Sequence, residues 1–195
     1  MGKYSYYTIC SDTSNSGLHN KTGEFEIIPY KGTNPLFKHG PLRVSEDKRY
    51  LTYLDGKPFF WLADTWWTGV SKRLRWGKDF KDLLNDRVSK GFTVILLIAG
   101  LFPDMEPLDE KCENEGGLPW NSGFESINPE YFEYMDRKIK SIVDAGIVPC
   151  IVGCWGYYLS FIGTKKIKKH WEYLIARYGA YPVVWCLAGE TICLL

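Results

Sequence analysis

From residue 58 onward, apolar runs alternate along the chain with segments in which apolar positions follow a helical period. Four of these runs lack the polar alternation of a half-exposed strand, which is typical of parallel strands buried on both faces. They are predicted as strands at Pro58–Ala63, Thr93–Ala99, Ile147–Val152 and Val183–Ala188. Their alternation with helical segments predicts a parallel sheet covered by helices.

Three helices are predicted between these strands from capping residues and apolar spacing. They are expected to run from the cap Asp79 to Gly91, from the cap Asn128 with Pro129 in first position to Gly146, and from near Thr164 to Gly179. The expected order of elements is therefore β-α-β-α-β-α-β.

Two stretches fall outside this rhythm. Leu101–Ser126 is roughly 26 residues long and has no periodicity, which exceeds the ~15 residues of an ordinary connection and is typical of loops that build sites. The amino-terminal part instead carries β signals, at Glu24–Ile28, Leu42–Ser45 and Tyr50–Tyr53, the last followed by an Asp55-Gly56 hairpin turn into the first parallel strand. We interpret residues 1–39 as the end of a β-rich module with its linker, and residues 40–195 as the βα domain.

Charge and hydropathy exclude several classes of partner. The 24 Lys and Arg residues balance 23 Asp and Glu residues, so the net charge of +1 does not favour nucleic acid as a partner. No apolar run approaches the ~20 residues of a membrane helix, and the first residues lack the apolar core of a signal peptide. The sequence as written therefore predicts a cytoplasmic protein without a membrane partner.

The six cysteines are predicted to be reduced and structural. Cys150 and Cys154 fall in one predicted strand, where four residues span about 13 Å, well beyond disulfide reach. Their spacing also does not match a metal site, because no second pair accompanies them. The sequence predicts no metal and no cofactor.

The candidate site residues follow the predicted strands at their carboxyl ends, where parallel βα proteins bind their ligands. Aromatic rings offer flat apolar platforms to sugars, and carboxylates bind hydroxyls or exchange protons with a glycosidic oxygen. The candidates are the carboxylates Asp64 and Glu190 and the aromatics Trp66, Trp67, Trp155 and Tyr157, in a chain with an aromatic share of 16%. This combination predicts a carbohydrate ligand.

Other readings of these residues stay open at this point. Asp64 could cap the following helix, and any one of the aromatic residues could belong to the core. Competing chemistries have weaker signals, since the sequence contains no phosphate-binding glycine loop, no nucleophile elbow and no metal-binding histidine pair.

Several segments of the chain carry a family resemblance. The strings GPLRVSEDKRYL at 40–51, GKPFFWLADTWW at 56–67, RVSKGF at 87–92 and VWCLAGE at 184–190 resemble the apiosidase-like glycoside hydrolases. The segment from Cys10 to Phe25 resembles the tail of the β-sandwich that often precedes that catalytic domain. The resemblance implies a (β/α)8 TIM-type barrel related to a large clan of retaining glycosidases, with only its first four strands in this chain.

In that clan the acid/base carboxylate ends the fourth strand, a position that Glu190 occupies, and the nucleophile comes from the seventh. Gly189 stands where many clan members have Asn. The chain is therefore expected to be a fragment of a longer enzyme, inactive alone and able to self-associate through exposed barrel edges.

Two functions follow as hypotheses. The first is an apiosidase-like glycosidase that cleaves plant-type polysaccharides or oligosaccharides by paired-carboxylate catalysis, with Glu190 as proton donor. The alternative is a non-catalytic carbohydrate-binding remnant of such an enzyme. A second carboxylate on a later strand would distinguish them.

Overall fold

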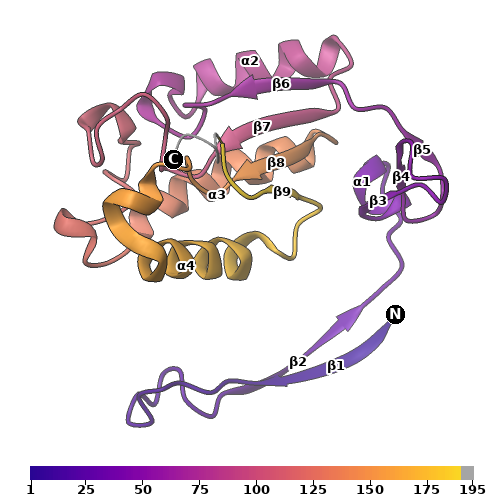
Figure 1. Ribbon diagram of the computed structural model, residues 1–195. Coiled ribbons are helices and arrows are strands. Elements are labelled where there is room, and N and C mark those ends of the chain that lie inside the picture. The colour runs from indigo at the N-terminus through magenta and orange to yellow at the C-terminus, as the bar shows by residue number, and fades with distance from the viewer. Residues whose placement is uncertain (190–195) are drawn as a thin grey trace. The chain divides into compact units, whose positions relative to one another are not determined.

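The computed structural model describes residues 1–189 and divides the chain into two compact units, residues 1–33 and the part from Asn34 onward. The first unit is an antiparallel hairpin of β1 (Gly2–Tyr7) and β2 (Thr22–Ile27), shown in indigo and violet in Figure 1. Strand β1 was not predicted from the sequence, and β2 begins two residues before the expected Glu24–Ile28. The assignment of residues 1–39 to the end of a sandwich stays a prediction.

The second unit begins with α1 (Pro35–His39) and a small antiparallel sheet. The sheet contains β3 (Leu42–Val44), β4 (Leu51–Tyr53) and β5 (Pro58–Phe59), in that order. The predicted turn between the last two is present, because the Gly56 amide donates to the Tyr53 carbonyl at 3.0 Å and Gly56 has φ 89°. Glycine tolerates this left-handed conformation without the steric cost of a Cβ atom.

A parallel sheet of four strands follows, in the order β6-β7-β8-β9. Three helices connect these strands, α2 (Lys78–Ser89), α3 (Pro129–Asp144) and α4 (Tyr158–Tyr178). The strands are β6 (Ala63–Trp66), β7 (Val94–Ile98), β8 (Val148–Val152) and β9 (Val184–Cys186). The predicted β-α-β-α-β-α-β order is confirmed, and Figure 1 shows the helices packed along the outside of the curved sheet.

The first parallel strand lies later in the sequence than predicted. The run Pro58–Ala63 was expected to be one strand, but Pro58–Phe59 pairs antiparallel with β4, and the parallel strand starts only at Ala63. Thr93 marks the crossing, because its hydroxyl donates to the Phe60 carbonyl at 2.6 Å and accepts from the Leu62 amide at 2.9 Å. These contacts turn the chain from the small sheet into the large one.

The helix boundaries agree with the sequence in part. Asn128 caps α3 as predicted, since its side chain accepts from the Glu130 amide. The predicted cap Asp79 is wrong, because α2 starts after Gly77, which has no side-chain cap, and Asp79 lies inside the first turn. Helix α4 begins six residues before Thr164, and the non-helical Gly163 (φ 76°, ψ 162°) separates its first turn from the rest.

The two faces of the parallel sheet have different partners. Along β7, Ile95 and Leu97 pack in the same cluster as the buried side chains of the three helices. Val94 instead packs with Val148 and Cys150 against Tyr53 and Phe59 of the small sheet. The small sheet therefore covers the opposite face near the amino ends of β7 and β8, and leaves the carboxyl ends of the strands as the place for a site.

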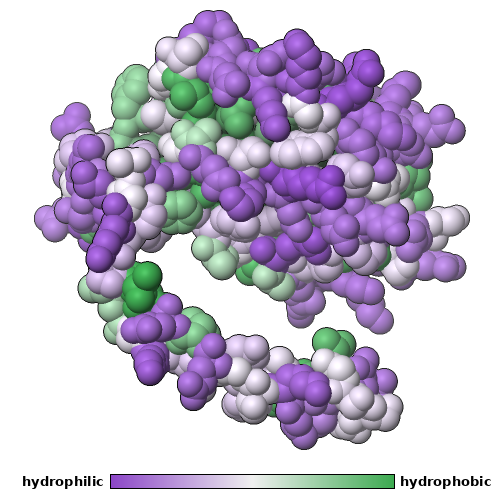
Figure 2. Space-filling model, turned by 180° about the vertical axis from the view of Figure 1, so that it is seen from behind, coloured by the Kyte–Doolittle hydropathy of each residue, from purple (hydrophilic) through white to green (hydrophobic). Residues whose placement is uncertain are grey.

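Hydrophilic side chains prevail on the face of this unit drawn in Figure 2, with apolar residues in small groups between them. None of the helices in the described part of the chain combines the length and hydrophobicity that a membrane crossing requires.

Candidate active site

Hydrogen bonds join the loops that leave the carboxyl ends of three strands. The Trp155 amide, after β8, donates to the Leu101 carbonyl, after β7, at 3.0 Å. The Gly156 amide donates to the Gly189 carbonyl at 2.8 Å, and Trp155 forms an isolated parallel bridge with Gly189 beyond β9. Main-chain bonds therefore fix the position of the segment that carries Trp155 and Tyr157.

Two of the predicted tryptophans meet at this end of the sheet. The rings of Trp67, after β6, and Trp155, after β8, have centroids 5.4 Å apart and planes inclined by 53°. Trp155 is buried, at 8% exposure, whereas Trp67 keeps 42% of its surface exposed. Trp155 thus supports a second indole ring that is open to a ligand.

Gly189 allows the Trp155 ring to take this position. A Cβ atom at residue 189 would lie 2.1 Å from Cζ3 of the Trp155 indole, far inside any possible contact. The buried ring also contacts Trp67, so it has little room to move away. A glycine at position 189 is therefore a steric requirement of the tryptophan pair.

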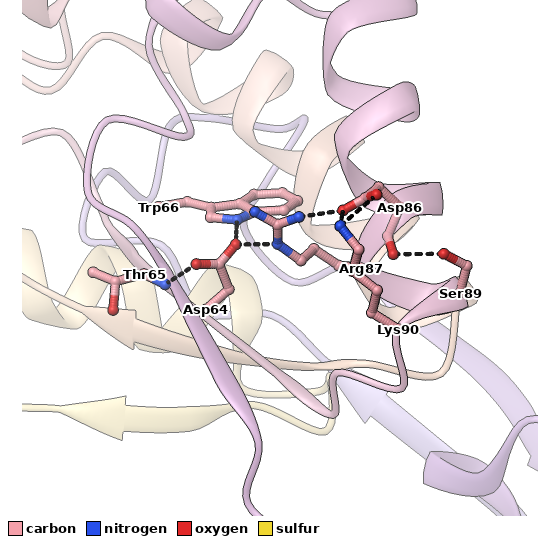
Figure 3. A network of polar contacts seen from close by, with 7 residues as sticks. All are labelled: Asp64, Thr65, Trp66, Asp86, Arg87, Ser89 and Lys90. Carbon is pink, nitrogen blue, oxygen red and sulfur yellow. Dashed lines mark hydrogen bonds and ion pairs between the residues drawn. The ribbon is translucent and has the colours of Figure 1, made fainter.

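Asp64 and Trp66 lie on the other side of strand β6, toward α2 (Figure 3). The Trp66 ring packs against Phe80 of α2 with centroids 5.7 Å apart, and its Nε1 donates to the Asp64 carboxylate at 2.7 Å. Arg87 of α2 also donates to Asp64 and forms an ion pair with Asp86. Asp64 thus links the first strand to the first covering helix.

The electrostatics of Asp64 match this linking position. Burial raises the pKa of the Asp64 carboxyl, but hydrogen bonds from Arg87, Trp66 and the Thr65 amide outweigh this effect and hold the pKa below its usual value. The group is therefore a carboxylate at neutral pH, able to accept hydrogen bonds but not to supply a proton.

Tyr157 ties the long loop, Leu101–Ser126, to the start of α4. Its hydroxyl donates one shared hydrogen bond to two carbonyls, that of Phe102 at 2.8 Å and that of Met105 at 3.2 Å. Its ring stacks on Tyr158 at 4.9 Å. The hydroxyl is thus engaged, and only the ring remains for a ligand.

Glu190, the predicted proton donor, lies outside the described residues. Of the six predicted site residues, the structure brings Trp67 and Trp155 into contact and places Tyr157 two residues further along the same loop. Asp64 and Trp66 form a separate contact with α2.

Lys138 is a residue that the sequence analysis missed. It is fully buried on α3, and its ammonium donates to the carbonyls of Gly69 (3.0 Å), Ser71 (3.1 Å) and Leu74 (2.6 Å). All three protons are therefore used to hold the loop that follows Trp67. Burial lowers the pKa of Lys138 to about 8.

His170 holds the segment that precedes Trp155, as Lys138 holds the loop that follows Trp67. It is fully buried on α4, where its Nδ1 accepts from the Trp120 indole at 3.2 Å. Its Nε2 therefore carries the proton and donates to the Gly153 carbonyl, at 2.9 Å, just before Trp155. Burial lowers the pKa of His170 to about 4, so the ring is neutral at physiological pH.

We expect His170 to make the fold sensitive to acid. The unfolded histidine binds a proton near its ordinary pKa of 6.5 and the folded one only near about 4, so stability is complete above pH 6.5 and falls as the pH drops toward 4. The total loss is on the order of 3 kcal/mol. Melting temperatures at pH 7 and pH 5 should differ more in the wild type than in His170→Gln. The matched control is His19→Gln, in the first unit, which should behave as the wild type does; an unchanged pH response in His170→Gln would contradict the assignment.

Metal ligands are not gathered at this end of the sheet. Within residues 1–189, no group of three or more His, Cys, Asp or Glu side chains is arranged to hold a metal ion. Five cysteines in this range, including Cys150 and Cys154, are free thiols. Burial raises the pKa of the Cys150 and Cys154 thiols to about 11, which keeps them protonated at neutral pH.

Residues 45–194 match the family model described as "Apiosidase-like, catalytic domain". The chain belongs to this family. The search of curated proteins found no match.

Among solved structures, this apiosidase-like chain is similar to a family 5 glycoside hydrolase from Bacteroides vulgatus ATCC 8482, at 27% identity and a TM-score of 0.61. A second structure, titled "Glycoside hydrolase", is 26% identical with a TM-score of 0.60. The matches cover 84% and 82% of this chain but only 35% and 36% of the matched chains. The apiosidase-like chain thus spans about a third of the length of these two proteins.

A third structure shows the fold alone. The family 5 mannosidase from Rhizomucor miehei is 14% identical, with a TM-score of 0.57, and the match covers 82% of this chain and 50% of the mannosidase. The parallel sheet and its helices are therefore those of glycoside hydrolases with (β/α)8 barrels.

Proposed function

We propose that this chain supplies the first four strands of a (β/α)8 barrel glycosidase that cleaves glycosidic bonds in plant-type polysaccharides or oligosaccharides. The observation that carries the proposal is the Trp67–Trp155 pair at the carboxyl ends of the strands, with one ring buried and the other exposed. Exposed indoles bind the C–H faces of sugars, and the family match supports hydrolase chemistry at this end.

The proposed division of roles follows the contacts of each side chain. The exposed Trp67 ring, supported by the buried Trp155, and the ring of Tyr157 form the floor for the sugar. Asp64 and Trp66 position the end of β6 that leads to Trp67, because Trp66 and Arg87 both donate to the Asp64 carboxylate. Glu190 is the proposed proton donor, on the evidence of its place in the family motif, and the second carboxylate comes from a later strand of the barrel.

The floor can be tested by binding. Replacing Trp67 with alanine should weaken sugar binding by about 1 kcal/mol or more, because the exposed ring loses its stacking contact, while the melting temperature changes little. The measurement is a ligand-observed NMR titration with a panel of neutral plant sugars, together with thermal unfolding of each variant.

Trp61→Ala is the matched control, because Trp61 is 39% exposed, close to the 42% of Trp67, but packs against Phe59 near the small sheet. Equal losses of affinity in the two variants would contradict the proposal. A drop in melting temperature with unchanged affinity in Trp67→Ala would assign that ring to packing instead.

A further inference from the structure

A groove with a volume of about 570 Å³ is lined by Tyr157, a residue of the proposed sugar floor, together with the long loop and the start of α4. The long loop supplies one group of its walls and the start of α4 the other. The residues that matter for its chemistry are Asp104, Glu106, Asp109, Lys111, Tyr157 and Phe161. The groove and the sugar floor share Tyr157.

The aromatic wall of the groove is exposed, and one of its two rings is bonded to the long loop. Phe161 leaves 59% of its surface open and meets the Tyr157 ring at 5.7 Å in a T-shaped arrangement. Tyr157 is fixed in turn by its hydroxyl, which donates to the loop carbonyls of Phe102 and Met105. A ligand would therefore meet the exposed Phe161 ring beside a tyrosine whose hydroxyl is bonded to the loop.

The polar wall has two available carboxylates. Asp104 and Glu106 are exposed, and within residues 1–189 neither carboxylate has a hydrogen-bond or ion-pair partner. Asp109 is already engaged, since it accepts from the Lys111 amide at 2.8 Å and lies 3.6 Å from the Lys111 ammonium. Carboxylates only accept hydrogen bonds, so this wall suits a ligand that presents hydroxyl groups.

The charge of the groove narrows the range of ligands that it can bind. Three carboxylates face a single ammonium, so a carboxylate-bearing sugar would meet like charge. A neutral sugar places its C–H face on the phenyl ring and its hydroxyls against the carboxylates without this repulsion.

We propose that the groove is a second sugar subsite, which binds the neighbouring unit of a neutral oligosaccharide whose first unit lies on the exposed Trp67 ring. The inference rests on the proposed function, because the first unit is placed there. Its main support is continuity: Tyr157 lies two residues after Trp155, and the Trp155 amide bonds to Leu101 at the start of the same long loop.

The test is the dependence of affinity on the length of the ligand, measured on residues 1–195 by ligand-observed NMR titration, a readout that does not require the protein to be monomeric. The probes are xylose and xylo-oligosaccharides of two to four units, with manno- and cello-series in parallel. The wild type should bind the two-unit or three-unit ligand of one series about tenfold more tightly than its monosaccharide, as one added stacking contact implies. Phe161→Ala should abolish this gain and leave monosaccharide affinity unchanged.

Leu159→Ala is the matched control, because Leu159 is 41% exposed on the same turn of α4 but does not line the groove. Equal affinity for one and several units, or the same loss in both variants, would overturn the second subsite while the first remains. Failure of every sugar in the panel to bind would overturn both. A length gain that persists in Phe161→Ala would place the second unit elsewhere, and since no step depends on hydrolysis, this result is independent of catalysis.

Discussion

Replacing Glu190 with glutamine is expected to lower glycosidase turnover at least about 100-fold in a complete barrel, while sugar binding survives. General acids contribute roughly 10² to 10⁴ to the rates of such reactions, and glutamine keeps the size of glutamate but cannot give up a proton to the leaving group. Because the solved relatives are about three times as long as the matched part, the assay needs the rest of a barrel. A fusion to the complementary half of the Bacteroides vulgatus hydrolase would supply it.

The fusion should carry three versions of this chain: wild type, Glu190→Gln and Asp64→Asn. Asp64 provides the matched control, because it is a carboxylate near a strand end whose bonds to Arg87 and Trp66 face α2. Asp64→Asn should alter stability more than turnover. Hydrolysis at the wild-type rate in Glu190→Gln would remove Glu190 from the mechanism. Absence of hydrolysis in all three versions, with sugar binding intact, would leave only the carbohydrate-binding proposal.

Purified residues 1–195 alone are expected to associate and to show no glycosidase activity. In the described residues, β6 pairs only with β7 and β9 only with β8, so each has one edge without a strand partner. Unpaired edges are templates for pairing with another chain. The exposed side chains of Leu187, at 74%, and Trp67, at 42%, add apolar surface at the same end.

The first parallel strand predicted from sequence, Pro58–Ala63, would have been one edge of the sheet. The structure places that edge at β6, since Pro58–Phe59 is paired within the small sheet. Light scattering on residues 1–195 should show dimers or larger species, and a lysine introduced at Thr65, an exposed residue of β6, should reduce them. The same substitution at Thr22, an exposed residue of the separate hairpin, is the control. A monodisperse wild-type chain that hydrolyses a glycoside unaided would contradict both parts of this expectation.

The sequence predicted the repeating architecture because each parallel strand and helix carries its own local signals. Helix α3 shows this best, with Asn128 as cap and Pro129 at its start. The prediction of a single strand over Pro58–Ala63 was wrong for a physical reason. The run is continuously apolar, and its division between two sheets depends on the distant hydroxyl of Thr93. Bonds between residues so far apart leave no local pattern in the sequence.

The places of the candidate site residues in the fold were predictable in part. The positions of Trp67 and Trp155 follow from the rule that parallel strands bind ligands at their carboxyl ends. The same rule does not predict that the Asp64 side chain faces α2, because this orientation depends on Arg87 of that helix. Lys138 and His170 did leave a signal, since each occupies a helical position three residues after one apolar residue and four before another. A charged or polar residue within an apolar stripe indicates a buried partner.

The steric coupling between Gly189 and Trp155 has a consequence for redesign. Because the indole occupies the space that a side chain at residue 189 would need, the side-chain sizes at positions 155 and 189 depend on each other. A substitution that places a hydrogen-bonding side chain at residue 189, to bind a sugar hydroxyl, therefore also requires a smaller side chain at residue 155. Under the proposed function, the present pairing would recognise a sugar by its shape and apolar face, where a polar side chain would recognise it by its hydroxyls.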